Sequence, residues 1–264
     1  MASFKPVIAV SRALAVLRAV NALDPATVGS IHEATGLNKA TIVRMLETLQ
    51  YEGLVVRGAA RNAYVPTGRT LQLSQGFDAR RRIGALADPI LDELRQRHGW
   101  PADVALFDVD AMIVVQSSAD QGPLTFRRRP GFRAPMLVTS MGRAYLAHCA
   151  PAERDRIVER LRRVKDRWTT LSRRPAELAS LLAEIRGRGF ATMDDEYSEY
   201  AYDGTVWSIA VPIVDDTALY GSMNLMLVRS AMPLKSAETR LVPPLKQAAT
   251  RLARLLTQAG MADT

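Results

Sequence analysis

The fold of the N-terminal part is decided by residues 27–56, TVGSIHEATGLNKATIVRMLETLQYEGLVV. Apolar residues recur at helical spacing in its first third, at Val28, Ile31 and Ala34. Gly36 follows them at the position where a left-handed residue ends a helix. Asn38 can then cap a second helix. The apolar positions of that second helix are Ile42, Val43, Leu46 and Leu49.

The second predicted helix also carries small polar and basic residues away from its apolar side. Lys39, Thr41 and Arg44 fall on that polar side, in the first turns of the helix. In a helix-turn-helix, the second helix presents its N-terminal side chains to the major groove of DNA. The segment therefore predicts a helix-turn-helix whose partner is double-stranded DNA.

A two-stranded wing is predicted directly after this helix pair. Residues 54–56 form a short apolar run, and residues 57–63 form a polar, basic turn. Tyr64 and Val65 then suit a returning strand that stops at Pro66. An ordinary helical hairpin that packs a core is the alternative interpretation. The wing and its basic turn favour the winged helix-turn-helix.

Composition limits the class of protein. The chain has 264 residues, enough for two domains with separate cores, and its formal net charge is +8. Nine basic and five acidic residues give residues 1–80 a net charge of +4. Many further arginines lie in residues 154–174, interleaved with acids, and we interpret them as a solvated helix face.

The chain shows no sign of export or of membrane insertion. No apolar run reaches the length of a membrane span, and no signal peptide precedes the first amphipathic stretch. The single cysteine, Cys149, excludes an internal disulfide framework and suits a reducing compartment. We therefore expect a cytoplasmic protein without membrane contact, with Cys149 a buried, inert thiol rather than a redox switch.

The rest of the chain predicts a connector and an α+β domain. Residues 67–77 and 79–97 are typical of helices, and their remaining apolar face suggests a second subunit. Strands are expected at 104–107, 112–115, 124–127, 190–193, 205–213 and 218–228. Helices are expected at 140–149, 152–168, 175–188 and 236–258. This order favours a largely antiparallel sheet with helices packed on it.

Several segments resemble the IclR family of bacterial transcriptional regulators, over nearly the whole chain. The resemblance rests on residues 11–17, 34–46, 52–55, 139–147 and 208–213. Residues 100–104 and 108–112 look most like the activators of phenylpropionate and hydroxyphenylpropionate breakdown. The resemblance implies a winged helix-turn-helix over 1–66, linker helices over 67–97 and a GAF-like effector-binding and oligomerisation domain over 98–264.

The partners implied by the resemblance are a pseudo-palindromic DNA operator, a small organic acid and further copies of the chain in a homodimer or tetramer. RNA polymerase is a further candidate partner. No cofactor is expected. The expected effector is an aromatic acid such as a hydroxyphenylpropionate; the alternative is a repressor that responds to a small aliphatic acid.

The resemblance and the helix pattern together assign residues to DNA. The recognition surface is expected to comprise Asn38, Lys39, Ala40, Thr41 and Arg44. Arg44 can read a guanine, and Thr41 can touch a phosphate or a thymine methyl. Arg12 is expected on the DNA backbone from the first helix, with Arg57 or Arg61 from the wing. Ala40 departs from the Ser or Thr often found there in the family, which places a hydrogen bond at that position in doubt.

An effector cavity is expected in the second domain. By position in the family pattern, its lining comprises Ser140, Met141, Val206, Ser208, Asn224 and Met226. Ser140 and Met141 open a helix whose N–H groups can hold an anion. Asp195 and Glu196 occupy the loop where the family carries acids near its effector. The alternative is that the methionines and Val206 are only core.

Three further residues suit an aromatic acid. Phe126 and Met136 can form apolar walls for a ring, and Arg133 can pair with a carboxylate. Such a site needs apolar surface and a few placed polar groups.

The sequence disfavours two other classes of function, an enzyme and an architectural DNA-binding protein. The three histidines are isolated and lack metal-ligand spacing with Cys149, and no phosphate loop or nucleophile elbow occurs, so no catalytic or metal site is expected. We interpret the acidic run at residues 194–196 as a solvated loop rather than as a cation-binding site. A ligand-independent architectural DNA binder would not need a second domain of this size.

Overall fold

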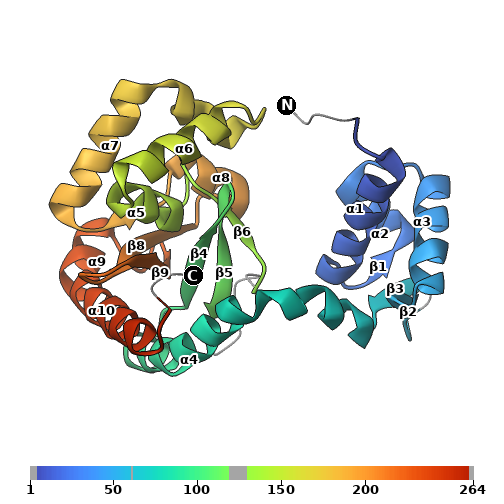
Figure 1. Ribbon diagram of the computed structural model, residues 1–264, viewed down its shortest axis with the longest axis horizontal. Helices are drawn as coiled ribbons and strands as arrows, with labels where there is room; N and C mark the ends of the chain where they lie inside the picture. The colour runs from blue at the N-terminus through green and yellow to red at the C-terminus, as the bar shows by residue number, and fades with distance from the viewer. Residues whose placement is uncertain (1–4, 61, 119–129, 262–264) are drawn as a thin grey trace. The chain divides into compact units, whose positions relative to one another are not determined.

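The structure is a computed structural model that describes residues 5–60, 62–118 and 130–261, with only the backbone for residues 75–81 (Figure 1). The chain divides into two compact units, Met1–Asp78 and Ala79–Thr264. We call them the N-terminal unit and the C-terminal unit. The expected strand at 124–127 lies outside the described residues.

The N-terminal unit is a winged helix-turn-helix, as predicted. Its elements are α1 (Ile8–Ala22), β1 (Ala26–Thr27), α2 (Val28–Thr35), α3 (Lys39–Tyr51), β2 (Val55–Arg57), β3 (Ala63–Pro66) and η1 (Gly68–Phe77). The wing is the antiparallel pair β2–β3, and β1 adds a third strand beside β3 that the sequence pattern did not indicate. Pro66 pairs with Val55 as the last residue of its strand.

Local side chains fix where the two helices of the motif begin and end. Thr27 and Ser30 form a reciprocal capping box, with Oγ–N distances of 3.1 and 2.9 Å, at the start of α2. Gly36 ends α2 in the left-handed conformation at φ 68°. Asn38 Oδ1 accepts a 2.8 Å hydrogen bond from the Thr41 amide at the start of α3. The predicted turn and cap are confirmed.

The core of the N-terminal unit corrects two apolar assignments. Ile42, Leu46 and Leu49 are buried with residues of α1 and the wing, as expected. Val43 and Ala34 are exposed instead, because they lie on the side of their helices that faces solvent. Val43 and its neighbour Arg44 are both exposed on α3.

The C-terminal unit is an α+β domain around an antiparallel sheet, as predicted, to which the described residues contribute six strands. Its first elements are α4 (Asp78–His98), β4 (Ala102–Asp108), β5 (Ala111–Ser117), β6 (Arg133–Pro135), α5 (Ser140–His148), α6 (Pro151–Arg162) and η2 (Arg167–Arg173). The others are α7 (Pro175–Arg188), β7 (Ala191–Thr192), α8 (Asp195–Tyr202), β8 (Val206–Val214), β9 (Leu219–Val228), α9 (Leu234–Arg240) and α10 (Val242–Gln258). The strand order is β6-β5-β4-β9-β8-β7.

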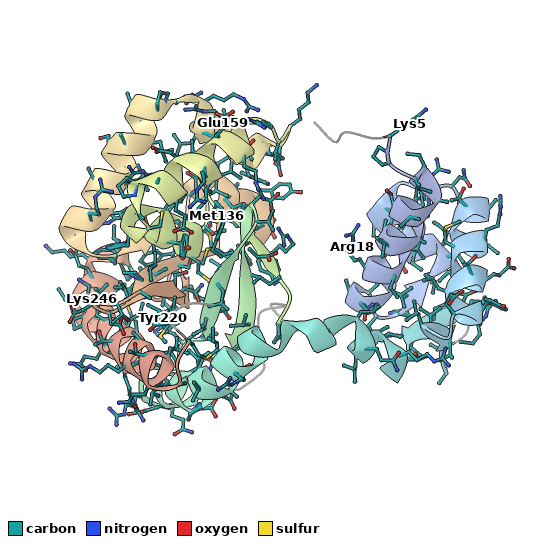
Figure 2. All side chains as sticks on the ribbon, in the orientation of Figure 1. Lys5, Arg18, Met136, Glu159, Tyr220 and Lys246 are labelled. Carbon is teal, nitrogen blue, oxygen red and sulfur yellow. The ribbon has the colours of Figure 1, made fainter. Side chains whose placement is uncertain are left out.

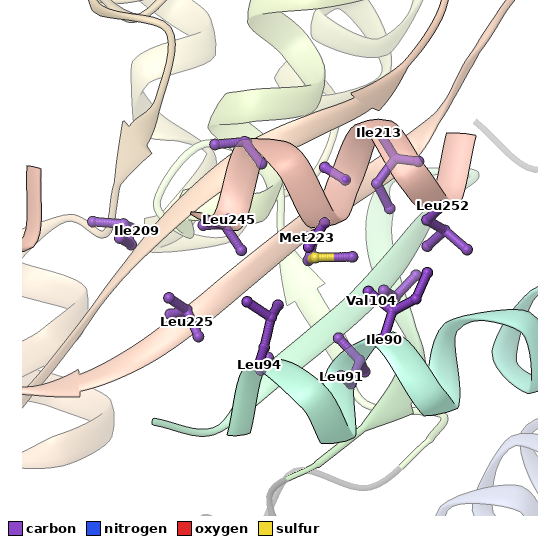
Figure 3. Close-up of a cluster of buried hydrophobic side chains, with 14 of the residues drawn as sticks. Ile90, Leu91, Leu94, Val104, Ile209, Ile213, Met223, Leu225, Leu245 and Leu252 are labelled. Carbon is purple, nitrogen blue, oxygen red and sulfur yellow. The ribbon is translucent and has the colours of Figure 1, made fainter. Parts of the chain in front are cut away.

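Helices cover both faces of this sheet. On one face, α4 and α10 enclose a cluster with Val104, Met223 and Leu225 from the central strands (Figure 3). On the other face, α5, α6 and α7 pack over Ala105 and Ala210. Cross-strand partners share a face, so Ser222 and Asn224, which pair with these two alanines, also face α5.

Helix α4 corrects one inference about assembly. Ile83, Ile90, Leu91 and Leu94 are buried against the sheet of the same chain. Its apolar face therefore does not indicate a second subunit. In η1, by contrast, the side chains of Leu71 and Leu73 are largely exposed.

Other element boundaries also differ from the prediction. The helix expected at 152–168 ends at Arg162, and η2 follows it as a separate 3-10 turn. The helix expected at 236–258 is two helices that break at Leu241, after which prolines occupy the first turn of α10. The segment expected as an acidic loop is the start of α8, which Asp194 caps.

A close approach of α5 to the turn after β6 yields the first prediction. A Cβ at Gly142 would lie 2.3 Å from the Met136 carbonyl oxygen, whereas a Cβ at Gly187 meets nothing within 4 Å. We expect Gly142→Ala to destabilise the C-terminal unit by about 2 kcal/mol or more. Gly187→Ala, in the helix α7, should be neutral or stabilise by about 0.5–1 kcal/mol. Urea unfolding of both variants measures this, and equal midpoints would contradict it.

Candidate functional site

The polar side of α3 is open to solvent, as a recognition helix requires. Asn38, Lys39, Ala40 and Arg44 are exposed, and Thr41 is half-buried. The Asn38 side chain caps the helix through the Thr41 amide, so its oxygen already has a structural role. The N-terminal end of α3 thus presents one ammonium and one guanidinium group beside small side chains, a surface that suits the major groove.

Two more of the proposed DNA contacts are placed on the same unit. Arg12 is exposed on α1, and Arg57 is exposed on the wing strand β2. The Arg57 guanidinium lies over the Tyr64 ring, 4.4 Å from its centroid, which holds it in place by a cation–π contact. Arg61 lies outside the described residues. Their contacts with DNA stay predictions.

In the C-terminal unit, the proposed serines meet in the interior. Ser140 from α5 and Ser208 from β8 are both buried, with 2.7 Å between their hydroxyl oxygens. Thr139, not Ser140, caps α5, because its Oγ1 accepts a 3.2 Å hydrogen bond from the Gly142 amide. The hydroxyl pair thus fixes α5 on the sheet, while Thr139 caps the start of the helix.

Asn224 is fully buried on the same face of the sheet. Its Oδ1 accepts a 2.9 Å hydrogen bond from the Asp103 amide on the neighbouring strand. The Asp103 side chain is also fully buried, and its Oδ1 accepts from the Ser117 hydroxyl at 2.6 Å. A carboxyl group therefore lies beside Asn224. The hydroxyl of Ser222, one pleat away, is buried and has no hydrogen-bond partner among the residues that the structure describes.

The proposed apolar lining is divided between two buried clusters. Met136 and Met141 belong to the cluster beneath α5, where Figure 2 shows Met136 in the interior of the unit. Val206 and Met226 belong to a smaller cluster, which we call the aromatic-side cluster. Its buried members are Val138, Met193, Tyr197, Val206 and Met226, with Trp168 and Tyr202 packed against it. Phe126 lies outside the described residues.

Arg133 is placed differently from the expectation that it meets a ligand carboxylate. Its guanidinium forms ion pairs with Asp108 and, at 2.5 Å, with Asp110. Partial burial lowers the pKa of Arg133, but the hydrogen bonds and charges of these two aspartates raise it overall. Two carboxylates already occupy this cation, which makes it a weak candidate for a third.

The acidic run at 194–196 is neutralised by arginines. Asp195 pairs with Arg229 at 2.8 Å, and Glu196 pairs with Arg167 at 2.7 Å. Among the described residues, no group of three or more His, Cys, Asp and Glu side chains could hold a metal ion. The run thus stabilises the start of α8 and its neighbours instead of forming a cation site.

A buried arginine that the sequence pattern did not single out connects these segments. The Arg143 side chain, 10% exposed, donates to the Leu137 and Thr192 carbonyls at 2.8 and 3.1 Å, and to Asp194 at 2.6 Å. Burial lowers its pKa, and the Asp194 carboxylate opposes that shift. One guanidinium therefore ties α5 to the segments before α5 and before α8.

Next to Arg143 lies a cavity of about 490 Å³, bordered by α5, η2, α7 and α8. Its volume is in the range of small-molecule sites. A second cavity of about 220 Å³ is lined by Arg133 and Met136, and the two share Leu137 and Trp168. Of the sequence-predicted effector residues that the structure describes, Glu196 alone lines the larger cavity. Arg167 and Trp168 were missed because their segment was expected to continue a solvated helix.

Two features concern the remaining expectations. Among the described residues, no helix is long and apolar enough to cross a membrane.

Cys149 is buried, as expected, and burial, aided by the charge of Glu153, raises the pKa of its thiol to about 11. Few thiolates form at neutral pH under these conditions, which fits an inert side chain.

A winged helix-turn-helix joined to an α+β unit with a cavity of this size defines a ligand-responsive transcriptional regulator. Family models agree with both halves: residues 9–59 match the IclR helix-turn-helix domain, and residues 78–254 match the bacterial transcriptional regulator IclR C-terminal domain. The chain belongs to the IclR family of bacterial transcriptional regulators. These proteins are DNA-binding regulators and not enzymes.

Named relatives support this membership. The HTH-type transcriptional regulator BhcR of Paracoccus denitrificans is 26% identical over 233 residues, which is 88% of this chain and 80% of BhcR. The HTH-type transcriptional regulator XynR of Escherichia coli is 27% identical over 207 residues, 77% of this chain and 79% of XynR.

Solved structures share the fold. The Thermotoga maritima IclR structure has a TM-score of 0.63 at 22% identity, covering 95% of this chain and 99% of its own. An IclR homologue from Microbacterium hydrocarbonoxydans, in complex with 4-hydroxybenzoate, has a TM-score of 0.67 at 19% identity, with 95% and 99% covered.

The exposed end of α3 yields a prediction for DNA binding. We expect Arg44→Ala to weaken specific binding to DNA from upstream of this gene by about 1–3 kcal/mol at fixed salt. Arg240→Ala removes a charge that is also exposed, from α9 in the C-terminal unit, and should leave affinity unchanged. Fluorescence anisotropy of labelled DNA measures both. An equal loss of DNA affinity in the two variants would mean that Arg44 acts only through the net charge of the chain and makes no specific contact.

The two paired arginines of the C-terminal unit make a matched stability test. Arg143→Gln leaves Asp194 without its nearly buried partner and should cost about 3 kcal/mol of unfolding free energy. Arg133→Gln breaks ion pairs of a half-exposed arginine and should cost at most about 1 kcal/mol. Urea unfolding of both variants gives the comparison. A larger loss in Arg133→Gln would reverse the assignment of Arg143 as the connecting residue.

Proposed function

We propose that this chain is an operator-binding regulator, acting in the cytoplasm, whose activity at a promoter is controlled by a small aromatic acid such as a hydroxyphenylpropionate. The observation that carries the proposal is the combination of an exposed basic recognition helix with a C-terminal unit that contains a ligand-sized cavity beside aromatic side chains.

The DNA contacts follow from the placement of the exposed residues. Lys39, Ala40, Thr41 and Arg44 on α3 enter the major groove, with Arg44 on a base and the others on phosphates or a thymine methyl. Arg12 on α1 and Arg57 on the wing contact the sugar–phosphate backbone. Two copies of the chain bind the two half-sites of a pseudo-palindromic operator, because a two-fold protein requires half-sites at helical-turn spacing.

An aromatic effector is supported by the side chains around the cavity and by one relative. Trp168 borders the cavity, and the aromatic-side cluster behind it offers methionine, valine and tyrosine surface. Thioether and aromatic groups suit an aromatic ring. The homologue bound to 4-hydroxybenzoate, although only 19% identical, shows that this fold can hold such an acid.

Control of DNA binding requires that the acid bind one state of the C-terminal unit better than the other. Ser140 and Ser208 fix α5 on the sheet, and Ser208 pairs across the strands with Met226 of the aromatic-side cluster. A ligand entering there shifts α5, and the linker residues transmit the change to the winged helices. A coupling of about 1–3 kcal/mol is usual, which corresponds to about 5- to 150-fold in affinity.

The test is fluorescence anisotropy on DNA from upstream of this gene and its neighbours, at fixed salt, with and without 3-(3-hydroxyphenyl)propionate or 4-hydroxybenzoate. We expect specific binding whose affinity shifts by about 5-fold or more with one of the acids. Specific binding that an aliphatic acid shifts and the aromatic acids do not would overturn the effector class. If the chain binds none of the fragments specifically, the proposal that it recognises an operator there is overturned.

A further inference from the structure

We infer that the exposed face of α10 is a second DNA-binding surface, which contacts phosphates of the duplex without reading its sequence. Its side chains are Lys246, Gln247, Thr250, Arg251, Arg254 and Gln258, and we call them the α10 face. The inference rests on the proposed binding to an operator, and it adds DNA contacts beyond those of the winged helix-turn-helix.

Helix α10 is divided into an apolar side and a cationic side. Leu245, Leu252 and Leu256 are fully buried in the cluster between α10 and the sheet (Figure 3). Over its 17 residues the helix has three basic residues and no acidic one. Acids and bases usually alternate on a solvated helix face, as Glu159 and Arg163 do at the end of α6. The exposed side of α10 lacks such acids and therefore carries charge of one sign.

Little of this charge is neutralised by neighbouring helices. Glu93 of α4 pairs with Arg251 at 2.7 Å. The same carboxylate pairs with Arg97 of α4 at 2.8 Å, so it serves two guanidinium groups at once. Among the residues that the structure describes, no ion pair joins Lys246 or Arg254 to a carboxylate. Four cations thus lie here against one paired carboxylate.

The cationic surface continues to the end of α7. A Cβ at Gly189 would lie 2.4 Å from the Lys246 ammonium nitrogen, so this side chain, labelled in Figure 2, lies against the end of that helix. Arg186 of α7 is exposed as well. Burial lowers the pKa of His148, its hydrogen bond to a backbone carbonyl opposes this, and the charges of Arg186 and Lys246 lower it further. Two helices therefore bring cations near the same imidazole.

The α10 face is hollowed between its side chains. A depression of about 560 Å³ is lined by residues of α10 alone, without a carboxylate. A second depression, of about 170 Å³, lies between α4 and α10 and shares Gln247 and Arg251 with the first. An anion there meets ammonium, guanidinium, amide and hydroxyl groups. These are the side-chain groups that contact phosphates in protein–DNA interfaces.

The composition of the α10 face favours DNA over an acidic protein. Protein–protein interfaces take much of their binding energy from a desolvated centre rich in Trp, Tyr and Arg. The α10 face has arginines but no aromatic or apolar side chain with which to form such a centre. Contacts with phosphates gain affinity from the release of counterions, so they require no apolar centre.

The α10 face is also long enough to meet several phosphates. Four of its residues, at positions 246, 250, 254 and 258, recur at every fourth position. At about 1.5 Å per residue they span about 18 Å along the helix. One strand of duplex DNA carries a phosphate about every 3.4 Å of the duplex axis. The donors of one helix can therefore contact consecutive phosphates of one strand.

The experiment is fluorescence anisotropy of the full chain on labelled DNA at a series of salt concentrations. The probes are the upstream fragment that the chain binds specifically, with about two helical turns of its own sequence kept on each side, and a scrambled fragment of equal length. The test variant is Lys246→Gln/Arg254→Gln, because both side chains are exposed and outside the ion pairs of Glu93.

We expect the test variant to bind both fragments about 10-fold more weakly near 0.1 M salt. The slope of log affinity against log salt concentration should fall in magnitude by about 2 for each bound copy. The ratio of the affinities for the two fragments should stay within about 2-fold of the original chain, because phosphate contacts carry no sequence information.

The matched control is Arg156→Gln/Arg163→Gln, in α6 and its C-cap residue. It removes the same charge from exposed positions outside the α10 face. We expect it to change both affinities by less than about 2-fold. Since all four substituted side chains are exposed, thermal unfolding midpoints of the original chain and both variants should be equal.

Four outcomes would overturn the inference. Equal losses of affinity in the test and control variants would mean that only net charge matters. A loss confined to the specific fragment would place the effect on operator recognition. Unchanged affinity and slope in the test variant would exclude DNA from the α10 face, and a lost effect on transcription by purified RNA polymerase would then assign the face to an acidic protein. No specific binding of the original chain to any upstream fragment would remove the proposed operator as well.

Discussion

The ligand side of the C-terminal unit depends on the buried guanidinium of Arg143. Its donors reach a carbonyl before α5, a carbonyl of β7 and the carboxylate that caps α8. Without this group, the Leu137 and Thr192 carbonyls and the Asp194 carboxylate would each lose a charged hydrogen-bond donor. Gly142, the preceding residue, allows the same helix to approach the Met136 carbonyl closely. Gly142 thus allows the close approach of α5 to the turn after β6, and Arg143 makes the polar contacts that hold α5 there.

Much of the N-terminal unit could be predicted because its signals are local. Gly36 and Asn38 each act on residues within four positions, and both worked as the sequence indicated. The start of α8 carries equally local signals, a cap at Asp194 and two acids in the first turn, but they were interpreted as a solvated loop. The local sequence therefore contains the signals needed to predict the start of α8.

The candidate ligand site was less accessible to sequence reasoning because its contacts are long-range. Trp168 meets Tyr197 and the two cavities only after η2 turns away from α6, and the continuous polar run between them hid that turn. Arg133 was an attractive cation by sequence, but the hairpin β4–β5 brings two aspartates to it. Because the pairing of strands cannot be predicted from a local pattern, the sequence did not show that the Arg133 side chain is already paired with two aspartates.

The burial of Cys149 has a practical consequence for labelling this protein at single sites. Its thiol lies in the interior, and a pKa of about 11 leaves little thiolate for maleimide or methanethiosulfonate reagents near neutral pH. The natural chain contains no other cysteine. A single cysteine introduced on α3 or in the wing would therefore react selectively, so spin labels or fluorophores can report on the N-terminal unit without first removing the native thiol.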